Sequence, residues 1–169
     1  GAVNIPVRVE PVATGPVGVV YRWDADTDIL TAHLKSKPVA GTRSGSVDIE
    51  GSDGSWLILD VEDGHIRSVE VAVWPTVRKR TDLCPPCEIE DVSVVLGTPA
   101  AGERVSALEV DTPLAADADR AERVIHFRLG PGRPTRTVRI AREILLDIDG
   151  HSRLAGVWLL NVPPFPADQ

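Results

Sequence analysis

Apolar and polar residues alternate over short stretches along almost the whole chain, as they do between residues 3 and 9. A two-residue period is typical of β-strands that bury one face. Turn-forming pairs such as Asp63-Gly64 and Asp149-Gly150 separate the stretches. The pattern therefore predicts an all-β fold of about a dozen strands. The predicted strands cover residues 3–9, 18–24, 28–35, 46–50, 56–62, 66–74, 89–96, 104–111, 122–129, 135–141, 143–149 and 154–162.

One segment has helical rather than strand character. Thr112 suits the N-cap of a helix and Pro113 its first turn, and alanine and charged residues follow as far as Arg123. The sequence therefore predicts at most one short helix, over residues 112–123, with a polar surface loop as the alternative.

A hairpin pattern occurs twice. Residues 59–62 read LDVE and residues 146–149 read LDID. After a one-residue insertion in the turn, the apolar and proline positions of 66–75 match those of 154–163. A similar strand precedes each copy, DILTAHLK before the first and RVIHFRLG before the second. The pattern predicts an internal repeat.

The repeat divides the chain into two related antiparallel β halves, residues 1–76 and 88–169, with a connector over residues 77–87. Each half alone is too short to bury a large core. We therefore expect the halves to pack as a sandwich or a barrel-like sheet pair within a single compact domain.

The first half carries a motif that extends beyond the hairpin. Trp23-Asp24 is followed by Asp28-Ile29-Leu30, and Leu59-Asp60-Val61-Glu62-Asp63-Gly64 by Ser68-Val69-Glu70-Val71. In this order and spacing the residues resemble the bacterial family called domain of unknown function 2283. The similarity covers residues 23–71 and the final hairpin of the second half.

The chain departs from this family at two positions. Thr31 stands where the family has a tyrosine, and Trp158 stands in the second copy where the first has Glu70. A chemical role of that glutamate could therefore be kept only at Glu70. Because the family has no settled activity, the resemblance implies a fold element and not a reaction.

Composition narrows the classes of protein to consider. The chain has 169 residues and a formal net charge of −7, and no apolar run approaches the roughly 18 residues of a membrane helix. We expect no membrane association, and the negative charge disfavours nucleic-acid binding. We interpret the one basic triplet, Arg78-Lys79-Arg80, as a solvated loop beside Asp82. No leader-like segment is visible, so we expect a cytoplasmic protein unless a signal has been removed.

The most conspicuous short motif is Cys84-Pro85-Pro86-Cys87. Our first interpretation is structural, either a local disulfide or two thiols in a stiff connector. A zinc site would need two further ligands from the four histidines, His33, His65, His126 and His151. A redox pair would need a following helix, whereas the sequence after Cys87 predicts a strand.

His33 and His126 both fall within the strands that precede the two hairpins. If the halves shared a cavity, these imidazoles could meet Asp24 or Glu70 and act as general bases. The alternative is that each is an ordinary strand histidine. Asp24, Asp26 and Asp28 could hold a hard cation, but a polar turn is the simpler interpretation.

Tryptophans supply most of the large apolar side chains. We expect them in the core, with Trp23, Trp74 and Trp158 as candidates to line a ligand cavity.

The sequence contains no recognised nucleophile elbow, phosphate loop or dinucleotide motif. We therefore expect a non-enzymatic binding or interaction module that uses no cofactor. Its partner would be a small hydrophobic molecule or another protein, and the chain could also form a homodimer. The first alternative is a small cofactor-independent enzyme that uses Asp, Glu or His on a hydrophobic molecule between the halves. The second is a zinc or redox protein centred on Cys84 and Cys87.

Overall fold

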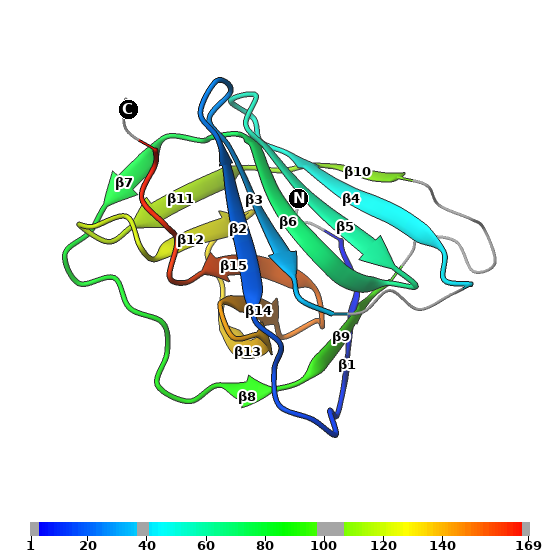
Figure 1. The fold of residues 1–169 in the computed structure, drawn as a ribbon. Coiled ribbons are helices and arrows are strands. Elements are labelled where there is room, and N and C mark those ends of the chain that lie inside the picture. Colours follow the sequence, from blue (N-terminus) through cyan, green and yellow to red (C-terminus); the bar gives the residue numbers. More distant parts are fainter. Residues whose placement is uncertain (1–3, 37–40, 98–106, 167–169) are drawn as a thin grey trace.

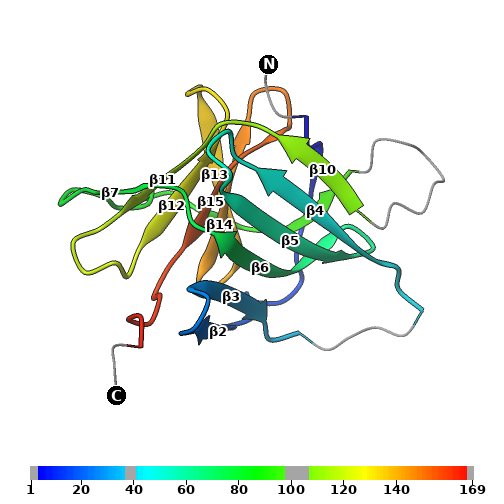
Figure 2. The same ribbon diagram turned by 90° about the horizontal axis from the view of Figure 1, so that it is seen from above.

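The computed structural model describes residues 4–36, 41–97 and 107–166, and within these ranges the protein is all-β. Fifteen strands form three sheets that pack together as a sandwich-like fold, as the alternation predicts (Figures 1 and 2). None of the described residues forms a helix that could cross a membrane. The starts of the predicted strands 3–9 and 104–111 lie outside the described residues.

A six-stranded sheet contains most of the first half. Its order is β10-β4-β5-β6-β3-β2. Every neighbouring pair is antiparallel except β10, which runs parallel to β4 at the edge. The strands are β2 (Val19–Asp24), β3 (Ile29–Leu34), β4 (Ser44–Glu50), β5 (Trp56–Glu62), β6 (His65–Val73) and β10 (Ala107–Asp111).

A seven-stranded sheet contains most of the second half, in the order β7-β11-β12-β15-β14-β13-β8. The five inner strands are antiparallel to one another, and the short edge strands β7 and β8 are parallel to their neighbours. The strands are β7 (Val77–Lys79), β8 (Glu90–Asp91), β11 (Leu114–Ala118), β12 (Ile125–Leu129), β13 (Thr135–Ala141), β14 (Ile144–Asp149) and β15 (Leu154–Leu159).

The two large sheets share an arrangement of five strands. The order β4-β5-β6-β3-β2 in one corresponds to β13-β14-β15-β12-β11 in the other, with antiparallel pairing throughout. The two hairpins also break register at matching places, after Asp60 in the first and after Asp147 in the second. The strand order therefore follows the duplicated pattern of the sequence.

A two-stranded sheet, β1 (Val7–Glu10) with β9 (Ser93–Leu96), joins the turns of both hairpins. The backbone N–H of Leu96 donates to the carbonyl of Gly64 in the first turn, and that of Val7 donates to Ser152 in the second. Because β1 and β10 each pair with a strand of the other half, the predicted halves are hydrogen-bonded into one body.

The predicted helix over residues 112–123 is wrong. Leu114–Ala118 form strand β11, which pairs with β7 on one side and β12 on the other. Small alanine side chains fit this crowded inner position, and two neighbouring strands satisfy the backbone groups. Tertiary pairing thus overrides the helical propensity of alanine. Thr112 caps no helix; its N–H bonds to the Glu50 carbonyl.

The predicted connector, residues 77–87, begins with strand β7, so Arg78 and Lys79 lie in a strand and not in a loop. All three residues of the basic triplet are exposed, and Arg80, just after the strand, meets Asp82 as predicted. Strands β7 and β8 lie at opposite edges of the seven-stranded sheet, and the segment 80–89 links them (Figure 1). Six strand spacings measure about 29 Å, and a chain of this length reaches at most about 36 Å. The segment is therefore largely extended, a conformation that Pro85 and Pro86 favour.

Candidate functional site

The four predicted acid–base residues are not gathered into one site. His33 is exposed on β3 and pairs in register with Val20 and Ser68. Glu70 lies opposite Thr31 on the same sheet, whereas His126 belongs to the seven-stranded sheet.

The strand registers also change which residues correspond between the two sheets. Thr31 pairs with Glu70 as His126 pairs with Trp158, so the counterpart of His126 is Thr31 and not His33.

The acidic residues at 24–28 form a local turn. The carboxylate of Asp24 accepts the N–H of Asp26 at 3.0 Å, and the carbonyl of Asp24 accepts the N–H of Asp28. Asp28 has a positive φ of 61°. Among the described residues, no group of three or more His, Cys, Asp or Glu side chains is arranged to hold a metal ion. The hydrogen bonds of this segment are those of the polar turn that the sequence predicts as the simpler interpretation.

Two of the tryptophans belong to an aromatic cluster that includes rings from both large sheets. Trp23 stacks on Trp74 with ring centroids 5.7 Å apart, and Phe165 meets the edge of Trp23 at 5.2 Å. Trp74 in turn contacts the fully buried Phe127. Each indole N–H is used, at Pro163 by Trp23 and at Asp28 by Trp74. These rings pack against one another and do not line the groove described next.

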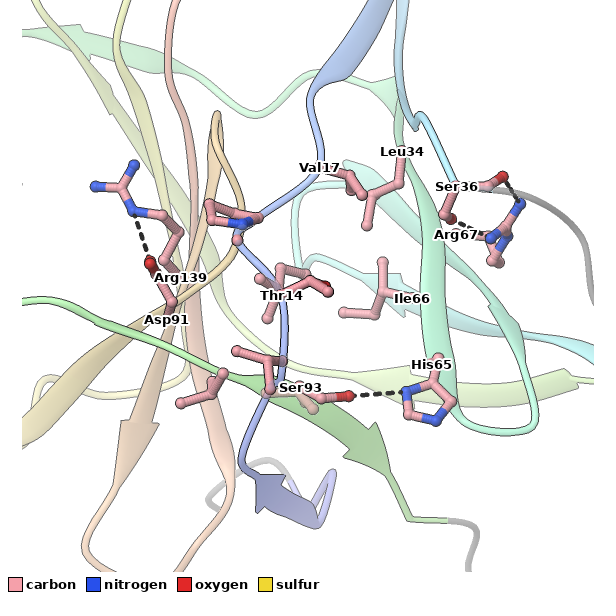
Figure 3. A pocket seen from close by; sticks show the side chains of 16 residues that line it. Thr14, Val17, Leu34, Ser36, His65, Ile66, Arg67, Asp91, Ser93 and Arg139 are labelled. Carbon is pink, nitrogen blue, oxygen red and sulfur yellow. Dashed lines mark hydrogen bonds and ion pairs between the residues drawn. The ribbon is translucent and has the colours of Figure 1, made fainter.

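A groove of about 210 Å³ lies where the three sheets meet (Figure 3). The segment between β1 and β2 forms one wall, and β6, β9 and β13 supply the others. Its floor is apolar because strands of all three sheets turn aliphatic side chains toward it. These side chains are Val17, Leu34, Ile66, Val92, Val94 and Ile140.

The rim of the groove carries paired polar groups (Figure 3). Nδ1 of His65 lies 3.3 Å from Oγ of Ser93. Arg139 meets Asp91 at 3.5 Å, and Arg67 donates to the carbonyl of Ser36 at 2.9 Å. Arg67 also lies 3.6 Å from Glu62 and donates to the Ser36 hydroxyl, and Arg139 also donates to the Arg142 carbonyl at 2.9 Å. The groove thus combines aliphatic side chains with two guanidinium groups whose five N–H donors each are only partly used by these contacts.

No local pattern identified the groove in advance. Its walls come from segments far apart in the sequence, and the sequence marks His65 only as one of four possible zinc ligands. Alternation marks Ile66, Val92 and Val94 as buried, but it cannot say that three sheets leave a gap between them.

A second group of polar residues lies on the seven-stranded sheet around His126. Nε2 of His126 is 2.6 Å from Oδ2 of Asp147, and its ring stacks on Trp158 with centroids 3.8 Å apart. Thr137 Oγ1 and Trp158 Nε1 donate to the other carboxylate oxygen at 2.7 and 3.1 Å. Asp147 is only 5% exposed.

The electrostatics of this group fix the tautomer of the imidazole. Burial alone would raise the pKa of Asp147, but the hydrogen bonds from His126, Thr137 and Trp158 outweigh it and lower the pKa. The carboxylate is therefore ionised at neutral pH and accepts hydrogen bonds. Nε2 of His126 therefore carries the proton of its hydrogen bond with Asp147.

Gly156 makes room for the contact between His126 and Asp147. A Cβ at this position would lie 2.3 Å from Oδ2 of Asp147 and 3.1 Å from Nε2 of His126. In the other hairpin the matching position is Ser68, whose hydroxyl donates to Asp60 at 2.8 Å. His126 thus takes the place of this serine as the side-chain donor to the aspartate.

Cys84 and Cys87 are both free and exposed in the segment that links β7 to β8. Their thiols are not bonded to each other, which leaves the free-thiol form of the structural interpretation.

No family model matches the chain, and no curated protein is similar to it. The resemblance to domain of unknown function 2283 stays an expectation.

Proposed function

We propose that the protein is a non-enzymatic binding module that holds a small amphipathic molecule in the groove between the three sheets. The observation that carries the proposal is the aliphatic floor of the groove, bounded by Arg67 and Arg139. An aliphatic chain would rest on Ile66 and its neighbours, and an acidic head group would meet the free guanidinium N–H donors.

The size of the groove limits the ligand. Pockets that enclose drug-sized molecules measure about 300–1,000 Å³, and this groove measures about 210 Å³. A short-chain carboxylate fits this volume, whereas a large cofactor does not. The proposal therefore names a small aliphatic carboxylate as the ligand class.

We also propose that the chain is built from two copies of one five-stranded unit. The duplicated hairpin sequence and the shared strand order support this proposal. In such a protein the groove lies at the junction of the copies, because its walls come from residues 12–67 and 91–140. A binding site at the junction of repeats needs both copies to fold.

The experiment is a titration of the ¹⁵N-labelled protein with hexanoate, octanoate and decanoate, with octanol as the uncharged comparison. We expect saturable shifts at the amides of Ile66, Ser93 and Arg139 with the carboxylates and weaker binding of octanol. The variant Val17→Trp fills the groove and should lower octanoate affinity about tenfold or more, a change of about 1.4 kcal/mol.

The matched control is Val20→Trp, which adds the same ring three residues away at a position that is 42% exposed. Equal binding by the two variants would contradict the proposal, as would shifts spread evenly over the surface.

A second proposal, acid–base catalysis, is favoured by the contact between His126 and Asp147. A buried carboxylate that orients an imidazole is the arrangement that prepares a general base, and the side chain of His126 is 14% exposed. If the protein hydrolyses a panel of simple esters, His126→Gln should abolish turnover and His33→Gln should not. Turnover that persists in both variants, or that is lost in both, would exclude this role for His126.

A further inference from the structure

Three arginines converge on one buried carboxylate at an edge of the seven-stranded sheet. Arg78 Nε lies 3.1 Å from Oδ1 of Asp117, Arg128 Nη2 lies 3.5 Å from Oδ2, and Arg80 Nη1 lies 3.7 Å from Oδ2. We call Arg78, Arg80 and Arg128 the arginine cluster. Arg78 lies on β7, Arg80 follows directly after it, and Arg128 lies on β12. Strands β7 and β12 are the two neighbours of β11, which carries Asp117.

The burial of these groups is unequal. The side chain of Asp117 is 3% exposed, whereas those of Arg78, Arg80 and Arg128 are 63%, 42% and 44% exposed. The negative charge is therefore covered, and the positive charges face solvent. Each guanidinium has five N–H donors, so one carboxylate cannot satisfy all three groups.

The local charge is positive although the chain carries −7. Asp82 also meets Arg80 at 3.5 Å, but its side chain is 74% exposed, and such surface pairs are weak. Lys79 is neutralised separately by Glu122 at 2.8 Å. A surplus of positive charge remains around Asp117 even when Asp82 is counted.

We propose that the arginine cluster is a binding site for the phosphate group of a small phosphate monoester. A phosphate monoester carries about −1.5 to −2 charges and three acceptor oxygens, which suits three guanidinium groups better than a carboxylate with two oxygens. Asp117 holds the guanidinium groups in place before the ligand arrives, which lowers the entropy lost on binding.

The geometry favours a single phosphate group as the ligand over a polyanion. All three guanidinium groups lie within 3.7 Å of the same carboxylate. A polyanion would need basic residues spaced along a surface, whereas this cluster is compact. The site is separate from the groove and does not depend on the function proposed for it.

The test is a titration of the full chain with inorganic phosphate and glycerol phosphate, at constant ionic strength, followed by the arginine Nε–Hε signals. Acetate and chloride are the comparison anions. We expect saturable shifts at Arg78, Arg80 and Arg128 with both phosphates, and at least tenfold weaker binding of acetate. The variant Arg128→Gln should weaken phosphate binding about tenfold or more.

The matched control is Arg22→Gln, which removes an exposed arginine from the six-stranded sheet. It should leave phosphate binding unchanged, and amide spectra of each variant report whether the fold is intact. The proposal is overturned if phosphate binding does not saturate, if acetate binds as tightly, or if Arg22→Gln weakens binding as much as Arg128→Gln. It is also overturned if Arg128→Gln lowers stability yet leaves phosphate binding intact.

Discussion

The imidazole of His126 lies 2.6 Å from the carboxylate of Asp147, at the place where a serine serves the matching aspartate in the other hairpin. The exchange needs a glycine at position 156, because a side chain there would occupy the space of the contact. The two hairpins therefore break register at matching places, but a serine donates to the aspartate in one and a histidine in the other.

Substitution of Gly156 by alanine should destabilise the protein by about 1–3 kcal/mol, the usual range for an overpacked core. The added Cβ would lie 2.3 Å from Oδ2 of Asp147 and 2.9 Å from the Phe127 carbonyl. Urea unfolding measures the effect. Gly132→Ala is the control because a Cβ at that position meets nothing within 4 Å. Similar unfolding free energies for the two variants would show that the region around Asp147 can relax.

The turn at Gly64 should tolerate alanine less well than the turn at Gly54. Both glycines have a positive φ, 83° and 86°, so alanine costs about 1–2 kcal/mol at either position. Only at Gly64 would the new Cβ also approach the Leu96 carbonyl at 2.9 Å. We expect Gly64→Ala to have the lower urea midpoint. The reverse order would mean that the two-stranded sheet does not rest on this turn.

Acidification should destabilise the fold from roughly pH 4 downward. Burial would raise the pKa of Asp149, but hydrogen bonds from Arg133, Arg153 and the His151 N–H outweigh it, so its pKa, like that of Asp147, is lowered. The pKa of an aspartate in the unfolded chain is about 3.9. The stabilisation is therefore complete above that pH and is lost as the pH falls toward the lower folded pKa.

The measurement for this pH dependence is the urea midpoint between neutral pH and pH 2.5. Asp149→Asn should be less stable than the unmodified protein at neutral pH and should lose less stability on acidification. Asp26→Asn, at an exposed turn position, is the control. An unchanged acid slope in Asp149→Asn would show that other groups dominate.

Both thiols should react with a disulfide reagent in the native protein. Cys84 and Cys87 are free and exposed, so we expect rapid labelling of two sulfurs per chain without denaturant. The double variant Cys84→Ser with Cys87→Ser should change the unfolding free energy by less than about 0.5 kcal/mol. Slow labelling that needs denaturant would contradict the exposure of the two thiols, whereas release of a metal during labelling would support the zinc alternative.

The sequence located most strands because alternation and turn residues are local signals. The hairpin strands β5, β6, β14 and β15 lie close to their predicted bounds. Leu114–Ala118 was predicted to be helical because the segment is rich in alanine, whereas its pairing with β7 and β12 makes it a strand, and such pairing leaves no local signal. Strand β7 was too short to give a periodic signal. The predicted strand 89–96 is divided in the structure into β8 and β9, which belong to different sheets.

The candidate residues were harder to predict than the strands. His126 and Trp158 were singled out, but their shared contact with Asp147 depends on strand register, which no local pattern specifies. The four acid–base candidates were grouped on the assumption of a shared cavity, and the structure places His126 in the seven-stranded sheet and the other three in the six-stranded sheet.

The sequence by itself determined the all-β class and the strands of the two hairpins, because these depend on the pattern of neighbouring residues. Only the tertiary structure decided that three sheets leave a groove beside Ile66, that His126 meets Asp147, and that three arginines surround Asp117. Each of these joins side chains from separate strands. Their distances depend on pairing register and sheet packing, which are set by the free energy of the whole fold and not by any short segment.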